Sequence, residues 1–258
     1  YFGQWQIKSL IGGSAQPKFN KTEFRKLEIP LPAYNTQRDI SQRLRVIDSL
    51  LTKYKSIQRT SKIIVSTLFK CWFIDFDPVK TKADNKLPYG MNHETAALFP
   101  NSFEDSELGP IPFGWTVTRI GDIVNLTKGL SYKGAFLEET EDEGKRMMNL
   151  GCFGIDGSFR RQKIKYYSGE HKERHQLERG DLLIANTDMT QDRIILGACI
   201  VIPSEYEGAL FTHHTTQLRV QKTLDPRINS FIAYHLSQPA FRHIAEGYST
   251  GSTVLALP

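Results

Sequence analysis

Cysteine is scarce in this chain, which has only three among 258 residues. Cys71, Cys152 and Cys199 are far apart and form neither a CxxC pair nor another metal-type spacing. The spacing therefore excludes a disulfide framework and a cysteine-based zinc site, and it favours unpaired thiols in a reducing, cytoplasmic setting.

Long apolar runs are also missing. No segment approaches the roughly 18 consecutive apolar residues that a membrane-spanning helix requires, and the N-terminus has no signal-peptide pattern. The composition, 40% hydrophobic and 24% charged, is ordinary for a globular protein. We therefore expect no membrane partner. Because the first residue is Tyr1 rather than Met, we expect the natural chain to extend upstream.

Catalytic motifs are lacking as well. An adenine methyltransferase would carry a glycine-rich cofactor loop and an NPPY or DPPY motif, and the chain has neither. The metalloprotease motif HExxH and the phosphate-binding motif GxxxxGK are absent too. The acidic stretch EETEDEG, residues 138–144, is more typical of a mobile loop than of a metal cage. We predict a non-catalytic chain with no metal site and no cofactor of its own.

Glycine and proline are absent from residues 35 to about 74, and this absence predicts one helix of about 40 residues, roughly 60 Å long. Its apolar positions follow the 4-3-4-3 spacing of a coiled coil and then continue with a shifted seam. We expect these positions to pack against another long helix, either from the same chain or from a partner: Ile40, Leu44, Ile47, Leu51, Tyr54, Ile64 and Leu68.

The remaining chain divides by composition. Residues 34–77 hold the long helix, and residues 78–108 are a polar linker with one short helix at His93 to Phe99. Residues 109–258 contain strand-like runs followed by a helical stretch that breaks before Pro239. Strands followed by helices predict an α+β fold with a mixed or antiparallel sheet, joined to the long spacer helix.

Positive charge is concentrated in the first third of the chain. The net charge is +5 overall, and by segment it is +3 for residues 1–34, +6 for 35–86, −4 for 87–108 and zero for 109–258. An excess of this kind favours an acidic partner such as nucleic acid, although a solvated basic face is the alternative.

Several segments together resemble the specificity subunit of a type I restriction-modification system. EIPLPAYNTQRDISQRL is similar to the family's junction between a target recognition domain and a spacer helix. The stretch from LFKCWFIDFDPVK to IPFGWTVTRIGDIV is similar to the linker into the second recognition domain. GDLLIANTDMT and STGSTVLAL resemble segments inside that domain. None of these is a catalytic signature, but they occur in the family's order along nearly the whole chain.

The resemblance implies a DNA-binding restriction-system subunit that reads half of a bipartite double-stranded DNA target. It implies methyltransferase subunits docked on the long helix, a restriction/translocase subunit held indirectly, and a homodimer through the long helix as a further arrangement. S-adenosylmethionine, ATP and Mg are implied for the partner subunits only. Residues 1–33 resemble the end of a preceding recognition domain, and residues 109–258 a recognition domain without its C-terminal segment. The rival interpretation is a coiled-coil scaffold or adaptor with a globular head and no DNA contact.

If the chain reads DNA, polar and cationic side chains on loops should contact bases and phosphates. The loop TKGLSYKG and the turn DGSFRRQK offer such groups, although a solvated turn and ordinary exposed charge are the alternatives. The candidates here are Lys128, Ser131, Tyr132, Lys133, Arg160 and Arg161.

The segments NTDMTQDR and FTHHTTQ are rich in side chains that pair with base edges. An Asx turn at Asn186 and Asp188 is the alternative for the first, and ordinary strand structure for the second. Neighbouring histidines in a strand would point to opposite faces, so we expect only one ring at any site. The candidates are Thr187, Asp188, Thr190, Arg193, His213, His214 and Thr215, with Ser14, Gln16 and Ser252 in the two Gly-Ser segments.

Those Gly-Ser segments echo each other. GGSAQPKFNKTEF begins at residue 12, and TGSTVLALP, residues 250–258, resembles its opening. The first copy continues into NKTEFRKLEIPLP, where Asn20 and Glu23 form a capping pair for a short helix. We expect residues 1–33 to serve as the C-terminal piece that the 109–258 domain lacks, in the same chain or in a second copy.

Overall fold

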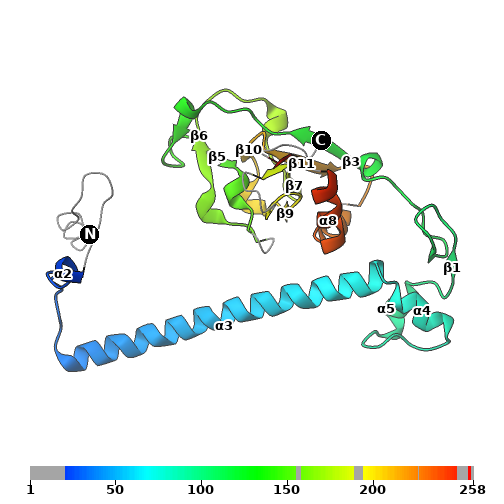
Figure 1. The fold of residues 1–258 in the computed structure, drawn as a ribbon, viewed down its shortest axis with the longest axis horizontal. Coiled ribbons are helices and arrows are strands. Elements are labelled where there is room, and N and C mark those ends of the chain that lie inside the picture. The colour runs from blue at the N-terminus through cyan, green and yellow to red at the C-terminus, as the bar shows by residue number, and fades with distance from the viewer. Residues whose placement is uncertain (1–20, 155–157, 189–193, 226, 249–254, 257–258) are drawn as a thin grey trace. The chain divides into compact units, whose positions relative to one another are not determined.

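The computed structural model describes residues 21–154, 158–188, 194–225, 227–248 and 255–256 (Figure 1). The chain divides into two structural units, Tyr1–Lys62 and Ile63–Pro258. The described elements combine helices with antiparallel and mixed sheets, so the predicted α+β fold is confirmed.

The long helix α3 spans Tyr34–Phe73, and its 40 residues confirm the helix predicted from the missing glycine and proline (Figure 1). A short helix, α2 (Lys21–Phe24), precedes it. The apolar positions predicted for partner packing are all exposed: Ile40, Leu44, Ile47, Leu51, Tyr54, Ile64 and Leu68. Their pairing with a second helix stays a prediction, as do the ranges of the four segments into which the sequence divides the chain. Within the described residues, no helix is long and apolar enough to cross a membrane.

Aromatic residues surround the C-terminal turns of α3. Phe69 is buried, and its ring centroid lies 5.3 Å from that of Phe231, while Phe73 lies 5.2 Å from the same ring. Phe76, at φ +55, turns the chain into α4 (Asp77–Ala83). The next elements are α5 (His93–Ala97), β1 (Phe103–Glu104) and β2 (Ile111–Pro112). The predicted linker is thus an ordered segment built around these rings.

Two four-stranded sheets form the rest of the second unit. One has the order β10-β5-β6-β4 and contains a parallel pair, β10 with β5; the other, β3-β11-β7-β9, is antiparallel throughout. Figure 1 shows β5 and β6 on one side of this unit, and β3 with α8 on the other. The strands are β3 (Val124–Lys128), β4 (Leu137–Glu138), β5 (Lys145–Met148), β6 (Lys165–Tyr167), β7 (Leu182–Ala185), β9 (Cys199–Val201), β10 (Leu210–Phe211) and β11 (Thr215–Val220).

The short elements connect these strands. A two-stranded ladder joins β8 (Thr187–Asp188) to β12 (Leu255–Ala256). The helices are α6 (Ile120–Ile123), α7 (Ile228–Leu236) and α8 (Pro239–Tyr248), with short 3₁₀ turns η1 (Gly134–Phe136), η2 (Leu150–Cys152), η3 (Arg161–Lys163), η4 (Glu173–His175) and η5 (Ser204–Tyr206). The break between α7 and α8 falls before Pro239, as predicted.

Strand β7 of the antiparallel sheet is covered on both faces. Alternation along β7 sends Leu182 into a cluster with Leu236 of α7, and sends Leu183 into the opposite cluster with Phe211. Because both faces are covered, β7 is a continuous apolar run rather than an alternating one. Gly197, at φ +71, forms a turn before β9.

A buried carboxylate ties β7 to β11. Asp181 is 3% exposed and accepts hydrogen bonds from the Gln217 amide (2.6 Å) and from two nitrogens of Arg219 (2.9 and 2.7 Å). It also accepts from the backbone N–H of Glu178 at 2.7 Å. Four donors on one buried carboxylate fix the register of the central strands.

Candidate nucleic-acid interface

Three of the predicted loops meet at one end of the antiparallel sheet. In the ladder, Thr216 of β11 lies opposite Lys128 on one side and Ile184 on the other. The end of β3, the end of β7 and the start of β11 therefore lie together. The loops that follow or precede them carry the sequence candidates.

Gly129 sets how closely two of these loops approach. A Cβ built on Gly129 would lie 2.2 Å from the carbonyl oxygen of Thr212, so only glycine fits there. Next to it, the backbone N–H of Leu130 donates to Phe211 O at 2.7 Å, and the N–H of His213 donates to Leu130 O at 3.0 Å. The loop after β3 is thereby held against the turn between β10 and β11.

A continuous row of side chains results, which we call the histidine cluster: Lys128, Tyr132, Lys165, Thr187, His213 and His214. The ammonium of Lys165 lies 5.6 Å from the Tyr132 ring centroid, in a cation–π geometry. The Tyr132 centroid lies 6.4 Å from that of His213, which lies 4.0 Å from that of His214. The row ends at Thr187, whose Oγ1 is 3.0 Å from His214 Nδ1.

The electrostatics of the cluster keep His214 neutral near neutral pH. Burial lowers the pKa of His214 below its ordinary value of 6.5, and the neighbouring His213 and Lys128 lower it further. Two buried polar atoms at the same place, Thr212 Oγ1 and His213 Nδ1, have no hydrogen-bond partner among the described residues. Such atoms are suited to completion by a bound polar group.

The expectation that the two histidine rings point to opposite faces was wrong. His213 and His214 lie in a turn rather than in a strand, closed by the N–H of Thr215 donating to Thr212 O at 2.9 Å. The strand alternation does not apply in a turn, so the two rings lie together in the cluster, with their planes tilted by 39°.

The other sequence candidates have different surroundings. Ser131 and Lys133 are exposed on the same loop as Tyr132. Thr215 is fully buried and its hydroxyl donates to Thr212 O, while buried Asp188 accepts from the N–H of Ile195 at 2.8 Å. These two contacts give Thr215 and Asp188 structural roles, and we leave both out of the proposed contact surface.

The two arginines of the turn DGSFRRQK contact residues outside the histidine cluster. Arg161 pairs with Glu205 at 2.7 Å and lies over the Tyr206 ring, 6.0 Å from its centroid. Arg160 is half-buried and donates its backbone N–H to Cys152 O. The remaining candidates, Thr190, Arg193, Ser14, Gln16 and Ser252, lie outside the described residues, as does Asn20.

Sequence reasoning missed Lys165. It lies in β6, in the other sheet, and it reaches the cluster only through the Tyr132 ring. No spacing in the sequence relates residue 165 to residue 132. The signal that could have drawn attention to it was its place in KIKYYS, a strand rich in lysine and tyrosine.

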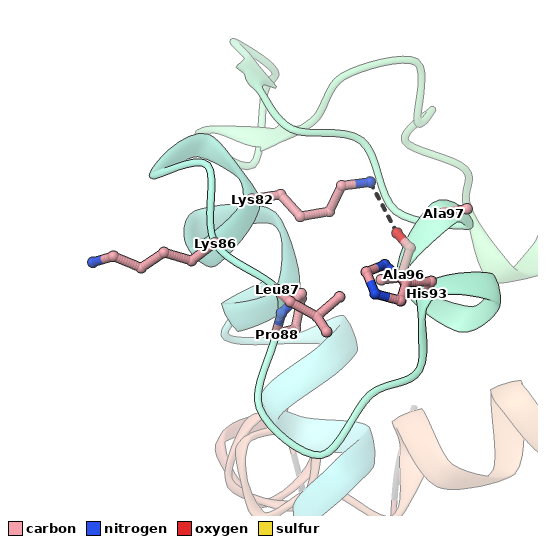
Figure 2. Close-up of a pocket in the computed structure, with 7 residues that line it drawn as sticks. All are labelled: Lys82, Lys86, Leu87, Pro88, His93, Ala96 and Ala97. Atoms are coloured by element: carbon pink, nitrogen blue, oxygen red, sulfur yellow. Dashed lines mark hydrogen bonds between the residues drawn. The ribbon is translucent and has the colours of Figure 1, made fainter.

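Other candidate sites in the described part of the chain are weaker. A pocket of about 330 Å³ lies beside α5. Figure 2 shows that Lys82 reaches across it to the carbonyl of Ala96, whereas Lys86 points away. The Lys82 ammonium also donates to Phe99 O, so it satisfies carbonyl groups at the C-terminal end of α5. The ligand atoms of Cys71, Asp75 and Asp77 lie within 4.8 Å of one another, but Asp75 is bonded to Lys70.

The chain does contain one GxSxG string, residues 247–251. In hydrolases this motif forms a turn from a strand into a helix. Here Gly247 and Tyr248 are the last two residues of α8, and residues 249–251 lie outside the described residues.

Comparisons with known proteins were made by sequence and by structure. Residues 3–63 match the family described as "Type I restriction modification DNA specificity domain". The chain is 32% identical over 123 residues to the type I restriction enzyme MjaIX specificity subunit of Methanocaldococcus jannaschii, covering 48% of this chain and 24% of that one. It is 34% identical over 82 residues to the HindI specificity subunit of Haemophilus influenzae, covering 32% and 18%.

Two solved structures are similar over nearly the whole chain. The HsdS subunit from Thermoanaerobacter tengcongensis matches with 16% identity and a TM-score of 0.42, covering 100% of this chain and 55% of that one. The type I S subunit from M. genitalium matches with 16% identity and a TM-score of 0.46, covering 95% and 53%. The chain spans a quarter or less of the length of the two curated relatives above. The sequence comparisons confirm the resemblance to type I specificity subunits.

Proposed function

We propose that this chain is a non-catalytic DNA-reading part of a type I restriction-modification specificity subunit. The histidine cluster and its neighbours contact one half of a bipartite duplex target. The single observation that supports this best is the convergence of cationic and polar groups from four separate segments on one sheet end, beside unpaired buried polar atoms.

Within this proposal, cations and hydroxyls have distinct tasks. Lys128, Lys133 and Lys165 are exposed and supply positive charge for phosphates, which sets the position of the duplex. Thr187 and the two histidines present hydrogen-bonding groups that read base edges. Asp181 and Gly129 do not touch DNA but hold the strands and loops that carry these groups.

The long helix α3 has a second task, docking methyltransferase subunits. Its exposed apolar positions support this, since exposed apolar stripes mark interaction surfaces. A restriction/translocase subunit joins through the methyltransferase, and a homodimer through α3 is a further arrangement. S-adenosylmethionine, ATP and Mg belong to those partners. The three cysteines are free thiols, which accords with the cytoplasmic setting proposed for such a complex.

The salt dependence of duplex binding tests the proposal against a scaffold that does not bind DNA. Each lost phosphate contact should reduce the slope of log K against log[salt] by about 0.9, so the triple substitution K128A/K133A/K165A should reduce it by about 2.7. Between 50 and 200 mM salt, this difference corresponds to about 40-fold in affinity.

A matched control removes the same charge elsewhere. Lys86, Lys145 and Lys222 are exposed lysines outside the cluster, and their triple alanine variant should keep the slope of the unmodified chain. The measurement is duplex binding by fluorescence anisotropy at several salt concentrations. Absence of duplex binding at low salt, or equal slopes for the two triple variants, would contradict the proposal.

A further inference from the structure

The hydrogen bond between Thr187 Oγ1 and His214 Nδ1 can have either atom as its donor. Which atom donates decides whether the Thr187 hydroxyl can donate to DNA or only accept from it. A hydroxyl has one proton to donate and two lone pairs to accept with, whereas a histidine ring nitrogen either donates or accepts. At 3.0 Å, the hydrogen between Oγ1 and Nδ1 comes from one partner or from the other.

The backbone fixes this pair firmly. The N–H of Asn186 donates to His214 O at 3.0 Å, so the two segments are joined on one side of the contact. Thr187 also pairs with Ala256 in the short β8–β12 ladder. The side-chain partner of the Thr187 hydroxyl in the structure is His214 Nδ1. The neighbouring Asp188 carboxylate accepts a hydrogen bond from the N–H of Ile195.

We infer that Thr187 is a specificity-determining residue and that His214 is its positioning residue: Thr187 donates its proton inward to His214 Nδ1 and presents only lone pairs to DNA. This inference rests on the proposed function. A group that only accepts pairs with the exocyclic amino groups in the major groove, adenine N6 and cytosine N4, and not with guanine O6 or thymine O4. Thr187 would therefore select adenine or cytosine at one position of the target.

Protonation reverses this direction. In the imidazolium form both ring nitrogens donate, so Nδ1–H must donate to Thr187 Oγ1 and the hydroxyl proton must turn outward. The charged groups recorded around the ring are His213, on the same turn, and Lys128, on β3. Both are cationic when charged, and together with burial they lower the pKa of His214. The inference therefore assigns the proton of the neutral ring to Nε2, which leaves Nδ1 as the acceptor of the Thr187 hydroxyl. Protonation in acid ends this arrangement and should remove the preference for an amino-bearing base.

The experiment is selection from a random duplex pool followed by sequencing, with the full chain at pH 8 and at about pH 5, which is below the ordinary pKa of a histidine. The unmodified chain at pH 8 should show adenine or cytosine at one position. Thr187→Val should lose about threefold to tenfold of that preference, the size of one hydrogen bond, while the other positions stay unchanged. Thr187→Ser should keep the preference, and Thr140→Val, on an exposed loop where Thr140 bonds Glu143, is the matched control.

His214→Phe separates positioning from mere structure. Phe keeps an aromatic ring beside His213 but cannot accept a hydrogen bond from Thr187. This variant at pH 8 should therefore select the same bases as the unmodified chain does at about pH 5. A pH-independent selection by the unmodified chain, or an unchanged motif in Thr187→Val or His214→Phe, would overturn the inference while leaving DNA reading intact. Absence of duplex binding by every variant at low salt would overturn the proposed function and this inference with it.

Discussion

The apolar seam of α3 gives the most direct test of assembly. Leu44, Ile47 and Leu51 are 55%, 53% and 53% exposed, so about half of each side chain remains to be buried by a partner. Fully burying such a side chain stabilises by about 1.5–3 kcal/mol, and the exposed half is therefore worth about 1 kcal/mol. Replacing all three with Gln should weaken docking by about 3 kcal/mol, or roughly 150-fold in Kd.

The assay measures binding of purified methyltransferase subunits, by co-purification and by calorimetry. Gln is a good helix former, so circular dichroism should show unchanged helix content. A matched control exists on the same helix: Val46 and Leu50 are 56% and 47% exposed but lie outside the 4-3-4-3 seam. V46Q/L50Q should bind normally. Normal binding by L44Q/I47Q/L51Q, or equal weakening by the control, would refute the reasoning.

Three further predictions concern stability. Asp181→Ala leaves Arg219 and Gln217 without their buried acceptor and should lower the free energy of unfolding by about 3–5 kcal/mol in urea titrations; a loss below about 1 kcal/mol would contradict the role of this carboxylate. Gly129→Ala forces a Cβ against Thr212 O and should cost about 1–3 kcal/mol by the same measurement, whereas Gly134→Ala, which meets no atom within 4 Å, should be nearly neutral. Burial is the first cause that lowers the pKa values of His175, His214 and His235, so the unfolded chain binds more protons than the folded one below about pH 6.5. Stability from these residues is complete above that pH and falls as the solution is acidified, and a Tm that rises between pH 7 and pH 5 would contradict this.

Local patterns in the sequence were sufficient to predict the main elements of the fold. The absence of glycine and proline located α3 to within a residue or two, and the strand-like runs expected within residues 109–258 include β5, β6, β7 and β11. These signals are local, because a helix or a buried strand needs a continuous pattern of side chains. Strands of two residues, such as β8 and β10, carry no such pattern, and they are defined by hydrogen bonds to distant segments.

The candidate site was predicted in part for the same reason. The polar composition of three loops indicated Lys128, Tyr132 and Thr187, but only the register of β11 between β3 and β7 brings those loops together. For Asp188 the sequence left base readout and an Asx turn as alternatives, and in the structure its carboxylate accepts from the N–H of Ile195, seven residues further along the chain. The close contact between the His213 and His214 rings depends on a turn, and the alternation rule for strands does not predict it.

Packing links the C-terminal turns of α3 to the strands beside the histidine cluster. Phe69 and Phe73, in the last turns of α3, contact Phe231 of α7, and the next residues of α7 pack on Leu218 of β11. His214 immediately precedes β11, and Thr187 follows β7 beside it. Because interiors are close-packed and deform little, the last turns of α3, α7 and the central strands should move as one body. In the proposed function, a partner that contacts the last turns of α3 would therefore act on the same packed body that carries the histidine cluster.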